Sequence, residues 1–222
     1  MAVDPADLSS ARARILSAML THVPFDGWSA QALEAGIADA GIEGPLARLA
    51  FQGGLTELAE YYARMADERM LAALDDQALA ALKIRERIGH VLRLRLEQAA
   101  PEREAVRALM SWLALPGNQT LGAKCLYRSV DAIWHGIGDS STDFNFYTKR
   151  AILAAVLAAT VLFWLGDDSD GFEATWAFLD RRLNDVMSIE KAKMRARDAW
   201  AKLPDPFRIL KDAFPSFRPP RG

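Results

Sequence analysis

The stretch that decides the fold begins with Gly138-Asp-Ser-Ser-Thr-Asp-Phe-Asn-Phe-Tyr-Thr-Lys-Arg150 and continues into Ala151-Ile-Leu-Ala-Ala-Val-Leu-Ala-Ala-Thr-Val-Leu-Phe-Trp-Leu165. Its second part is apolar nearly all round, which is typical of a helix buried in a core. The apolar run is too short to favour a helix that spans a bilayer. We therefore expect a core helix over residues 143–165 that starts with polar turns.

The first turns of this helix are expected to carry an unusual face. If a hydroxyl at position 141 or 142 caps the helix, residues at i, i+3, i+4 and i+7 share one side. These residues are Asp143, Phe146, Tyr147 and Arg150. A face that mixes two aromatic rings with both signs of charge is more typical of a docking surface than of a core. The alternative, in which these residues cap the helix and fill the core, stays open.

Helical spacing of apolar residues extends along the whole chain, and no useful length of it alternates with period two. We expect an all-α protein with helices near residues 8–22, 29–40, 45–51, 56–74, 77–99, 102–115, 119–137, 143–165 and 172–200. Three regions are predicted: a helix-turn-helix-like region over 1–56, a helical bundle over 57–200, and a basic amphipathic tail over 201–222.

The front end has a helix-turn-helix arrangement. The segment Ile37-Ala-Asp-Ala-Gly-Ile42 resembles the turn of TetR-type regulators. Residues 1–60 nevertheless contain three cations, Arg12, Arg14 and Arg48, against eight carboxylates. Repulsion from the phosphate backbone opposes docking on DNA, so we expect no nucleic-acid partner. A TetR-type transcriptional regulator with a lipid effector is the alternative function.

Residues suited to catalysis or metal binding are sparse. The three histidines, His22, His90 and His135, lie on separate predicted helices without a helically spaced carboxylate or cysteine. The spacings that hold zinc do not occur, and Asp167-Asp-Ser-Asp-Gly171 departs from the calcium-loop pattern in its glycine and its missing glutamate. We expect a non-catalytic protein without a metal or a cofactor. A single cysteine, Cys125, excludes an internal disulfide.

Residues 138–151 closely resemble the signature of the CoQ-nine family, accessory proteins of ubiquinone (coenzyme Q) biosynthesis. The resemblance extends over about residues 14–197, through Pro24-Phe-Asp-Gly-Trp28, residues 131–135 and Phe172-Glu-Ala-Thr-Trp-Ala-Phe-Leu-Asp180. The family usually has Trp where this chain has Phe146. The exchange keeps an aromatic ring and loses the indole N–H.

The resemblance implies a TetR-like fold and a role in presenting a polyprenylated quinone intermediate to the di-iron demethoxyubiquinone hydroxylase. Carried over residue by residue, the surface that binds this partner has two aromatic anchors, Phe146 and Tyr147, with aspartates that set the register. The predicted partner-binding residues are Asp131, Ile133, Asp139, Asp143, Phe146, Tyr147 and Arg150.

The resemblance also implies a bound isoprenoid quinone or phospholipid, and the second half of the chain is rich in bulky apolar residues. We expect the lipid to contact Trp112, Leu126, Trp134, Ile152, Val156, Leu162, Trp164 and Trp176. Each of these could equally fill a helical core. The alanines at positions 151, 154, 155, 158 and 159 allow either close helix packing or space for a ligand.

The tail and the amino terminus bear on localisation. Residues 199–222 hold five cations and two carboxylates among several phenylalanines, which suits an anionic membrane surface. The predicted membrane-binding residues are Phe207, Arg208, Leu210, Lys211 and Phe214; a disordered tail or a packed clasp is the alternative.

Residues 1–8 have no apolar segment, so we expect no signal or transit peptide and a bacterial protein on the inner face of the membrane. Analogy with TetR-like folds favours a homodimer.

Overall fold

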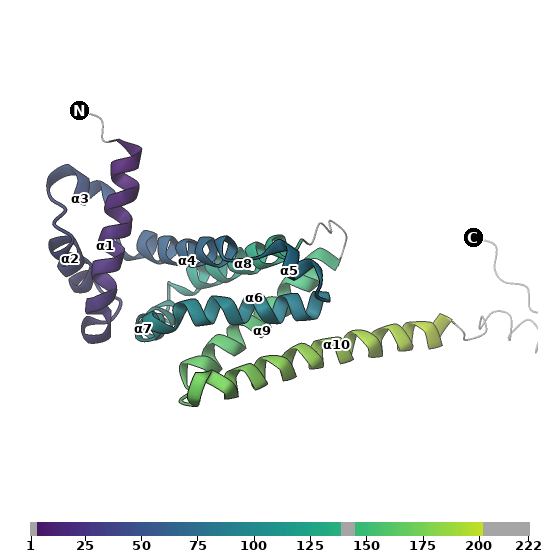
Figure 1. The fold of residues 1–222 in the computed structure, drawn as a ribbon. Coiled ribbons are helices and arrows are strands. Elements are labelled where there is room, and N and C mark those ends of the chain that lie inside the picture. Colours follow the sequence, from purple (N-terminus) through teal and green to yellow (C-terminus); the bar gives the residue numbers. More distant parts are fainter. Residues whose placement is uncertain (1–3, 139–144, 202–222) are drawn as a thin grey trace, which may run out of the picture. The chain divides into compact units, whose positions relative to one another are not determined.

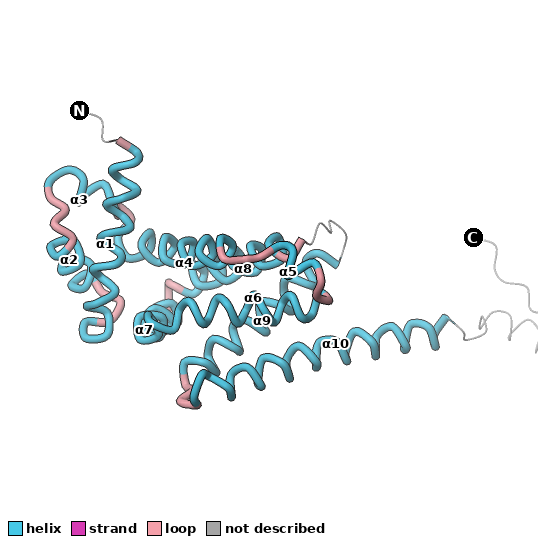
Figure 2. The backbone as a smooth tube through the Cα atoms, viewed as in Figure 1, coloured by secondary structure: helices cyan, strands magenta, loops and turns pink. Residues whose placement is uncertain are grey.

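The computed structural model describes residues 4–138 and 145–201, and every regular element in these ranges is a helix (Figures 1 and 2). The prediction of an all-α protein is confirmed. The chain divides into two compact units, Met1–Asp180 and Arg181–Gly222. The first unit holds both the front end and the helices behind it, and the second holds most of the last helix.

The front end consists of α1 (Pro5–Asp26), α2 (Ala30–Asp39) and α3 (Gly44–Ala50). Side chains start the first two helices, since Asp4 accepts a hydrogen bond from the N–H of Ala6 and Ser29 accepts one from Ala32. Such caps satisfy N–H groups that have no partner inside the helix.

Helix α1 runs four residues beyond its predicted end. Pro24 lies in the last turn of the helix, although a proline removes one backbone hydrogen bond there. The helix ends instead at Gly27, whose φ of 68° suits glycine and whose N–H donates to the carbonyl of Val23.

A close helix contact holds the front end together. Gly36 of α2 lies so near α1 that a Cβ atom at this position would be 2.7 Å from the backbone of Met19. Met19 and Ile15 are fully buried, and the core they form continues to Leu58 and Leu109 in later helices. The front end therefore shares one core with the helices that follow it.

Behind the front end, α4 contacts α6 and α8, and α8 contacts α9 (Figure 1). These elements are α4 (Gly54–Ala72), α5 (Asp76–Ala80), α6 (Ile84–Ala99), the short 3₁₀ helix η1 (Ala100–Glu102), α7 (Arg103–Leu113), α8 (Gln119–Gly136) and α9 (Asn145–Leu165).

The single helix predicted over 77–99 is two helices, α5 and α6. Each of the two helices starts at its own carboxylate. Asp75 accepts hydrogen bonds from the N–H groups of Gln77 and Ala78 and starts α5. Glu86 accepts one from the N–H of Lys83 and starts α6.

Helix α9 is only partly buried, so the expectation of a helix enclosed on all sides is wrong. Leu153, Leu157 and Trp164 lie in the core, but Leu162 is 61% exposed and Phe163 is 38% exposed. The stretch Tyr147–Leu165 is long and apolar enough to cross a membrane by length and composition, contrary to the sequence estimate, and 39% of it is buried. Core helices of soluble proteins meet the same criterion, so length does not assign this helix to a bilayer.

The turn after α9 is built around one buried carboxylate. Asp167 accepts hydrogen bonds from the N–H and hydroxyl of Ser169 and from the N–H and hydroxyl of Thr175. Burial alone would raise the pKa of this carboxyl, yet these hydrogen bonds hold it well below its usual range. The turn leads through η2 (Asp170–Phe172) into α10 (Glu173–Ala201).

Candidate functional site: an apolar cavity with a charged wall

A cavity of about 390 Å³ lies among α4, α6, α7, α8 and α9 of the first unit. This volume is within the range of small-molecule sites in proteins. The lining is largely apolar, with a few polar groups. It comprises Tyr62, Ala63, Ala66, Arg95, Leu96, Ala99, Val106, Leu109, Met110, Leu113, Ala114, Gln119, Gly122, Ala123, Cys125, Leu126, Ser129, Leu157, Ala158, Val161 and Trp164.

The cavity exists because small residues line it from several helices. Ala66 on α4, Ala99 on α6, Gly122 on α8 and Ala158 on α9 leave space that larger side chains would fill. A Cβ atom on Gly122 would lie 3.5 Å from the side chain of Leu113, an ordinary contact distance. The sequence left two possibilities open for the alanines of α9, close helix packing or space for a ligand, and Ala158 lines the cavity.

One end of the cavity reaches the surface at the corner between α7 and α8. Ala114, Gln119 and Ala123 line the cavity and are themselves exposed. Leu115, in the same corner, is 52% exposed. We call these residues the rim of the cavity.

A group of charges at the opposite end, which we call the charged wall, reaches the cavity lining through Arg95. The carboxylate of Asp67 lies 2.6 Å from Nη1 of Arg95 and 3.5 Å from Nε of Arg128. Arg95 also donates from Nη2 to the hydroxyl oxygen of Ser129, at 3.2 Å. Arg95 and Ser129 both line the cavity, so its surface is not uniformly apolar.

A second, partly buried network lies next to the first. The hydroxyl of Tyr62 donates to Glu102 at 2.8 Å, and Arg69 donates two hydrogen bonds to the same carboxylate. Burial, together with the negative charge of Glu102, raises the pKa of the Tyr62 hydroxyl, which therefore stays protonated. This network connects α4 to the segment before α7.

Arginines fix the end of α9 beside the cavity. Arg103 donates to the backbone carbonyls of Trp164, Leu165 and Asp167, and Arg107 donates to the carbonyl of Leu165. A cation at a helix C-terminus satisfies free carbonyls and interacts favourably with the helix dipole. Trp164 is fully buried in this position.

Of the eight residues predicted to contact lipid, Leu126 and Trp164 line the cavity. Trp112 packs against the core shared with the front end. Trp134 and Val156 are buried elsewhere, Ile152 is half-buried and Leu162 is exposed. Trp176 is buried under the guanidinium of Arg93, 4.9 Å from its ring centroid.

Sequence reasoning missed the contribution of α7. Val106, Leu109, Met110 and Leu113 all line the cavity. Their spacing of i, i+3, i+4 and i+7 is the pattern of an apolar helix face and was available in the sequence.

The predicted partner-binding residues are partly brought together. Arg150 is buried and forms an ion pair with Asp131, with Nη2 2.7 Å from the carboxylate. Tyr147, one turn earlier on α9, is 71% exposed, whereas Ile133 is fully buried beneath this surface. Asp139 and Asp143 lie outside the described residues, as does the side chain of Phe146. We call Asp131, Tyr147 and Arg150 the α8–α9 face.

The predicted membrane-binding residues Phe207, Arg208, Leu210, Lys211 and Phe214 also lie outside the described part of the chain. Their role stays a prediction.

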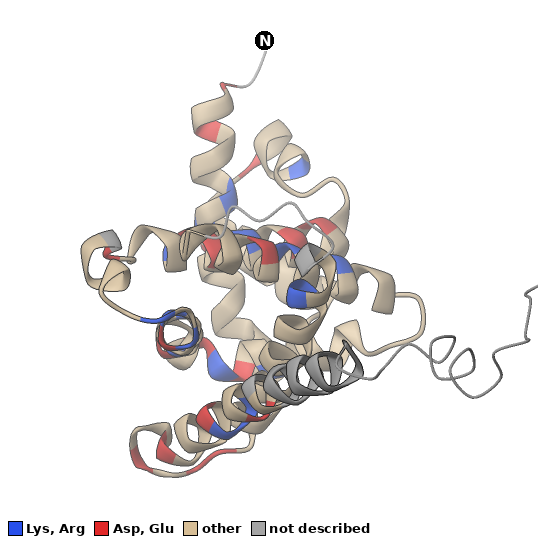
Figure 3. Ribbon diagram, turned by 90° about the vertical axis from the view of Figure 1, so that its right-hand side faces the viewer, with Lys and Arg blue, Asp and Glu red and all other residues tan. Residues whose placement is uncertain are grey.

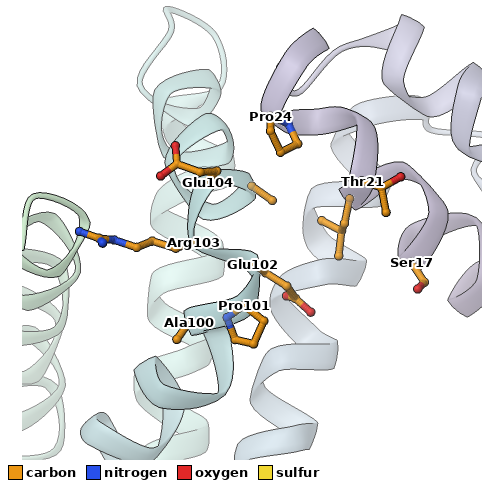
Figure 4. Close-up of a pocket in the computed structure, with 10 residues that line it drawn as sticks. Ser17, Thr21, Pro24, Ala100, Pro101, Glu102, Arg103 and Glu104 are labelled. Carbon is orange, nitrogen blue, oxygen red and sulfur yellow. The ribbon is translucent and has the colours of Figure 1, made fainter. Parts of the chain in front are cut away.

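A second hollow, of about 480 Å³, lies between α1 and the segment before α7. Figure 4 shows Ser17, Thr21 and Pro24 on one side and residues 100–104 on the other, with Arg103 pointing away from α1. Two of its polar groups are already used, because Glu102 binds Tyr62 and Arg69 and the Thr21 hydroxyl donates to the carbonyl of Ala18. It is therefore a poorer ligand site than the apolar cavity.

Two of the three front-end cations are engaged within the fold. Arg12 forms an ion pair with Glu57, and Arg14 donates to the carbonyl of Ala40. Arg48 is the third cation of residues 1–60 and is exposed. In the view of Figure 3, basic and acidic residues are interspersed along the coloured helices and do not form a basic face.

The histidines form no metal cluster in the part of the chain that the structure describes. His22 of α1 lies 2.7 Å from the carboxylate of Asp39 on α2, a contact between helices that sequence spacing does not reveal. His90 and His135 are exposed.

The fold and the cavity define a class: a TetR-like helical protein with an apolar internal site. The structure is similar to the crystal structure of a TetR transcriptional regulator from Nitrosomonas europaea, with a TM-score of 0.64 and 24% sequence identity over 82% of this chain and 97% of that one. This likeness concerns the fold alone.

Residues 119–190, which include two walls of the cavity, match the family model COQ9. The chain is 36% identical over 183 residues to the human mitochondrial ubiquinone biosynthesis protein COQ9, covering 79% of this chain and 57% of that protein. A probable coq9 protein of Dictyostelium discoideum is 30% identical over 81% of this chain and 61% of its own length. The chain belongs to the COQ9 family, and it spans less than two thirds of the length of these relatives.

Proposed function

We propose that this protein is a non-catalytic accessory protein of ubiquinone biosynthesis. It holds an isoprenoid lipid in the apolar cavity and presents a polyprenylated quinone intermediate to the demethoxyubiquinone hydroxylase at the membrane. The observation that carries the proposal is an apolar cavity of about 390 Å³ whose α8 and α9 walls lie in the segment that matches the COQ9 family.

The size of the cavity limits how much of a lipid enters. A volume near the lower end of the range for drug-sized ligands holds a ring and a short length of chain. The rest of a polyprenyl chain extends beyond the rim. The free-energy cost of leaving the bilayer is modest for the enclosed part, because apolar protein contacts replace lipid contacts.

The α8–α9 face is the proposed contact with the hydroxylase. An exposed tyrosine supplies a large ring with a polar tip, the kind of side chain that anchors protein interfaces. Tyr147 lies one turn from the Asp131–Arg150 ion pair, which fixes α9 against α8 at this point. Holding enzyme and lipid at one membrane patch raises the effective substrate concentration.

The remaining parts of the proposal concern location and assembly. The basic tail binds the inner face of a bacterial membrane, and the protein is a homodimer. Flotation with anionic vesicles tests the first statement, and sedimentation equilibrium tests the second.

A role as a transcriptional regulator is less well supported, although the fold is shared with one. Arg12 and Arg14 are engaged by groups within the protein and are not available to bind phosphates. Sequence-specific retardation of DNA by nanomolar protein at low salt would favour the regulator and contradict the proposal.

Two measurements test the proposed function directly. Solvent extraction of the purified protein, followed by mass spectrometry, should reveal co-bound isoprenoid lipid. Replacing Tyr147 with Lys should abolish co-purification with the hydroxylase and change the free energy of unfolding by less than about 0.5 kcal/mol, as for other surface substitutions.

Phe25→Lys is the matched control, because Phe25 is 89% exposed on the front end. It should leave co-purification intact. A large fall in the melting temperature of the Tyr147→Lys protein would instead mean that this ring contributes to the core.

A further inference from the structure

The cavity has one polar end, formed by Arg95 and Ser129. Ser129 is 4% exposed, and the side chain of Arg95 is 15% exposed. Both belong to the lining. A buried hydroxyl and guanidinium in an otherwise apolar wall carry a free-energy cost unless their hydrogen-bonding capacity is used.

This capacity exceeds what the protein uses. A guanidinium has five N–H donors. In the described part of the chain, Arg95 contacts the carboxylate of Asp67 through Nη1 and the hydroxyl oxygen of Ser129 through Nη2. The hydroxyl of Ser129 accepts this bond, and no acceptor for its own hydrogen is found among the described residues. Donors are therefore in excess at this end of the cavity.

The charges at this end are also unequal. Asp67 is shared by Arg95 and Arg128, so two positive charges face one negative charge. The neighbouring carboxylate, Glu102, is bound by Arg69 and does not compensate. A positive local potential in a low-dielectric wall favours an electron-rich oxygen.

The polar end and the open rim lie far apart along α8. Ser129 is ten residues beyond Gln119 at the rim, which corresponds to about 15 Å along a helix. Ser129 is also two residues before Asp131 of the α8–α9 face. The cavity thus has an open end that is mostly apolar and a closed end that donates hydrogen bonds.

We propose that Arg95 and Ser129 bind a hydrogen-bond-accepting oxygen of the lipid, so that its carbonyl or carboxylate lies at the closed end and its apolar chain extends toward the rim. This inference rests on the proposed function, because it requires a lipid in the cavity. It extends that function by assigning an orientation to the bound lipid. A quinone ring held this way lies against α8, on the side of the helix that faces away from Asp131. Its chain leaves the protein at the corner between α7 and α8.

Three probes with the same decyl chain test the inference: decylubiquinone with ring carbonyls, undecanoate with a carboxylate, and decylbenzene with neither. Isothermal titration calorimetry of the full chain gives their dissociation constants. At least one of the acceptor-bearing probes should bind about tenfold more tightly than decylbenzene, as expected for one hydrogen bond to a charged donor. The tighter of the two identifies whether a carbonyl or a carboxylate is the better ligand.

The variant D67N/R95Q removes one positive and one negative charge together. It should lose the roughly tenfold preference and bind decylbenzene as the wild type does. Ser129→Ala changes less of the wall and should lose about threefold, so the inference stays testable if the double variant fails to fold. R64Q/E68Q, which alters an exposed pair on α4, is the matched control and should keep the preference.

The outcomes separate the two proposals. If none of the probes binds, the lipid-binding function and the inference both fail. If all three bind equally to the wild type, or if both wall variants keep the preference, lipid binding stands and the polar subsite is overturned.

Discussion

The front end and the cavity region both place glycine where helices meet, with opposite results. At Gly36 the backbone of Met19 occupies the space that a side chain would need, and a Cβ atom would be 2.7 Å away. At Gly122 the nearest atom would be 3.5 Å from a Cβ, and the space opens into a cavity. A small residue permits close packing only where another backbone fills the gap; elsewhere it leaves a hollow.

The two regions also use their arginines differently. In the front end, Arg14 donates to a backbone carbonyl and Arg12 to another carbonyl and a carboxylate, so these cations join helices. Around the cavity, Arg95 and Arg128 meet one buried carboxylate in the wall. The same residue type thus joins helices of a filled core in one region and adds buried charge beside a hollow in the other.

Removing the carboxylate of the wall should have the largest effect on stability. Asp67→Ala leaves Arg95 and Arg128 without their shared partner, and breaking a buried pair costs about 3–5 kcal/mol. Chemical denaturation monitored by circular dichroism measures this loss. Glu97→Ala removes the partner of exposed Arg93 and should cost less than about 1 kcal/mol. Equal losses in the two variants would mean that the wall is solvated like the surface.

The glycine contrast predicts the next largest effect. Gly36→Ala forces α1 and α2 apart and should destabilise the protein by about 1–3 kcal/mol. Gly122→Ala meets ordinary contacts and should stabilise α8 by up to about 1 kcal/mol, the helix-propensity difference between the two residues. Melting temperatures of both variants test the comparison. A Gly36→Ala protein as stable as the wild type would show that the front end is not closely packed.

Much of the fold could be predicted because its signals are local. The ends of α2 and α8 agree with the sequence to within a residue or two, since capping side chains and apolar spacing act over a few positions. The division between α5 and α6 was missed because Lys83 and Glu86 lie inside a continuous apolar pattern. The exposed side of α9 was missed because the sequence of an apolar helix does not determine which of its sides other helices cover.

The site was harder to predict, because its parts are distant in sequence. Leu126 and Trp164 were found among bulky residues of the second half, and the spacing within α7 could have added Leu109 and Leu113. The charged wall joins Asp67 to partners on two later helices. No spacing rule connects such positions, so a charged wall of this kind can be identified only from the tertiary structure.

Acid should distinguish the turn after α9 from the rest of the fold. The depressed pKa of Asp167 gives stability that is present above the unfolded value of about 3.9 and is lost as the pH falls below it. We expect a loss of about 1 kcal/mol, similar to that of a helix-start carboxylate. Urea denaturation between about pH 5 and pH 3 measures it. Asp167→Asn should remove this dependence of the free energy of unfolding on pH. Asp39→Asn, at the exposed contact with His22, is the control and should keep it.

The smallest effect tests whether the hollow is occupied. Cys125 is the single cysteine and lies in the cavity wall, and burial raises the pKa of its thiol, so its alkylation by N-ethylmaleimide should be slow. Decylbenzene at a few times its dissociation constant should slow the reaction by about threefold or more, since only the empty cavity admits the reagent. Tyr127→Cys in a Cys125→Ser background places the thiol at an exposed position of the same helix, where decylbenzene should have no effect. The alkylation rates of Cys125 are compared at a decylbenzene concentration where calorimetry shows binding. Equal rates with and without the probe would place it outside this cavity. The contrast between a filled front end and a hollow second region would then be lost.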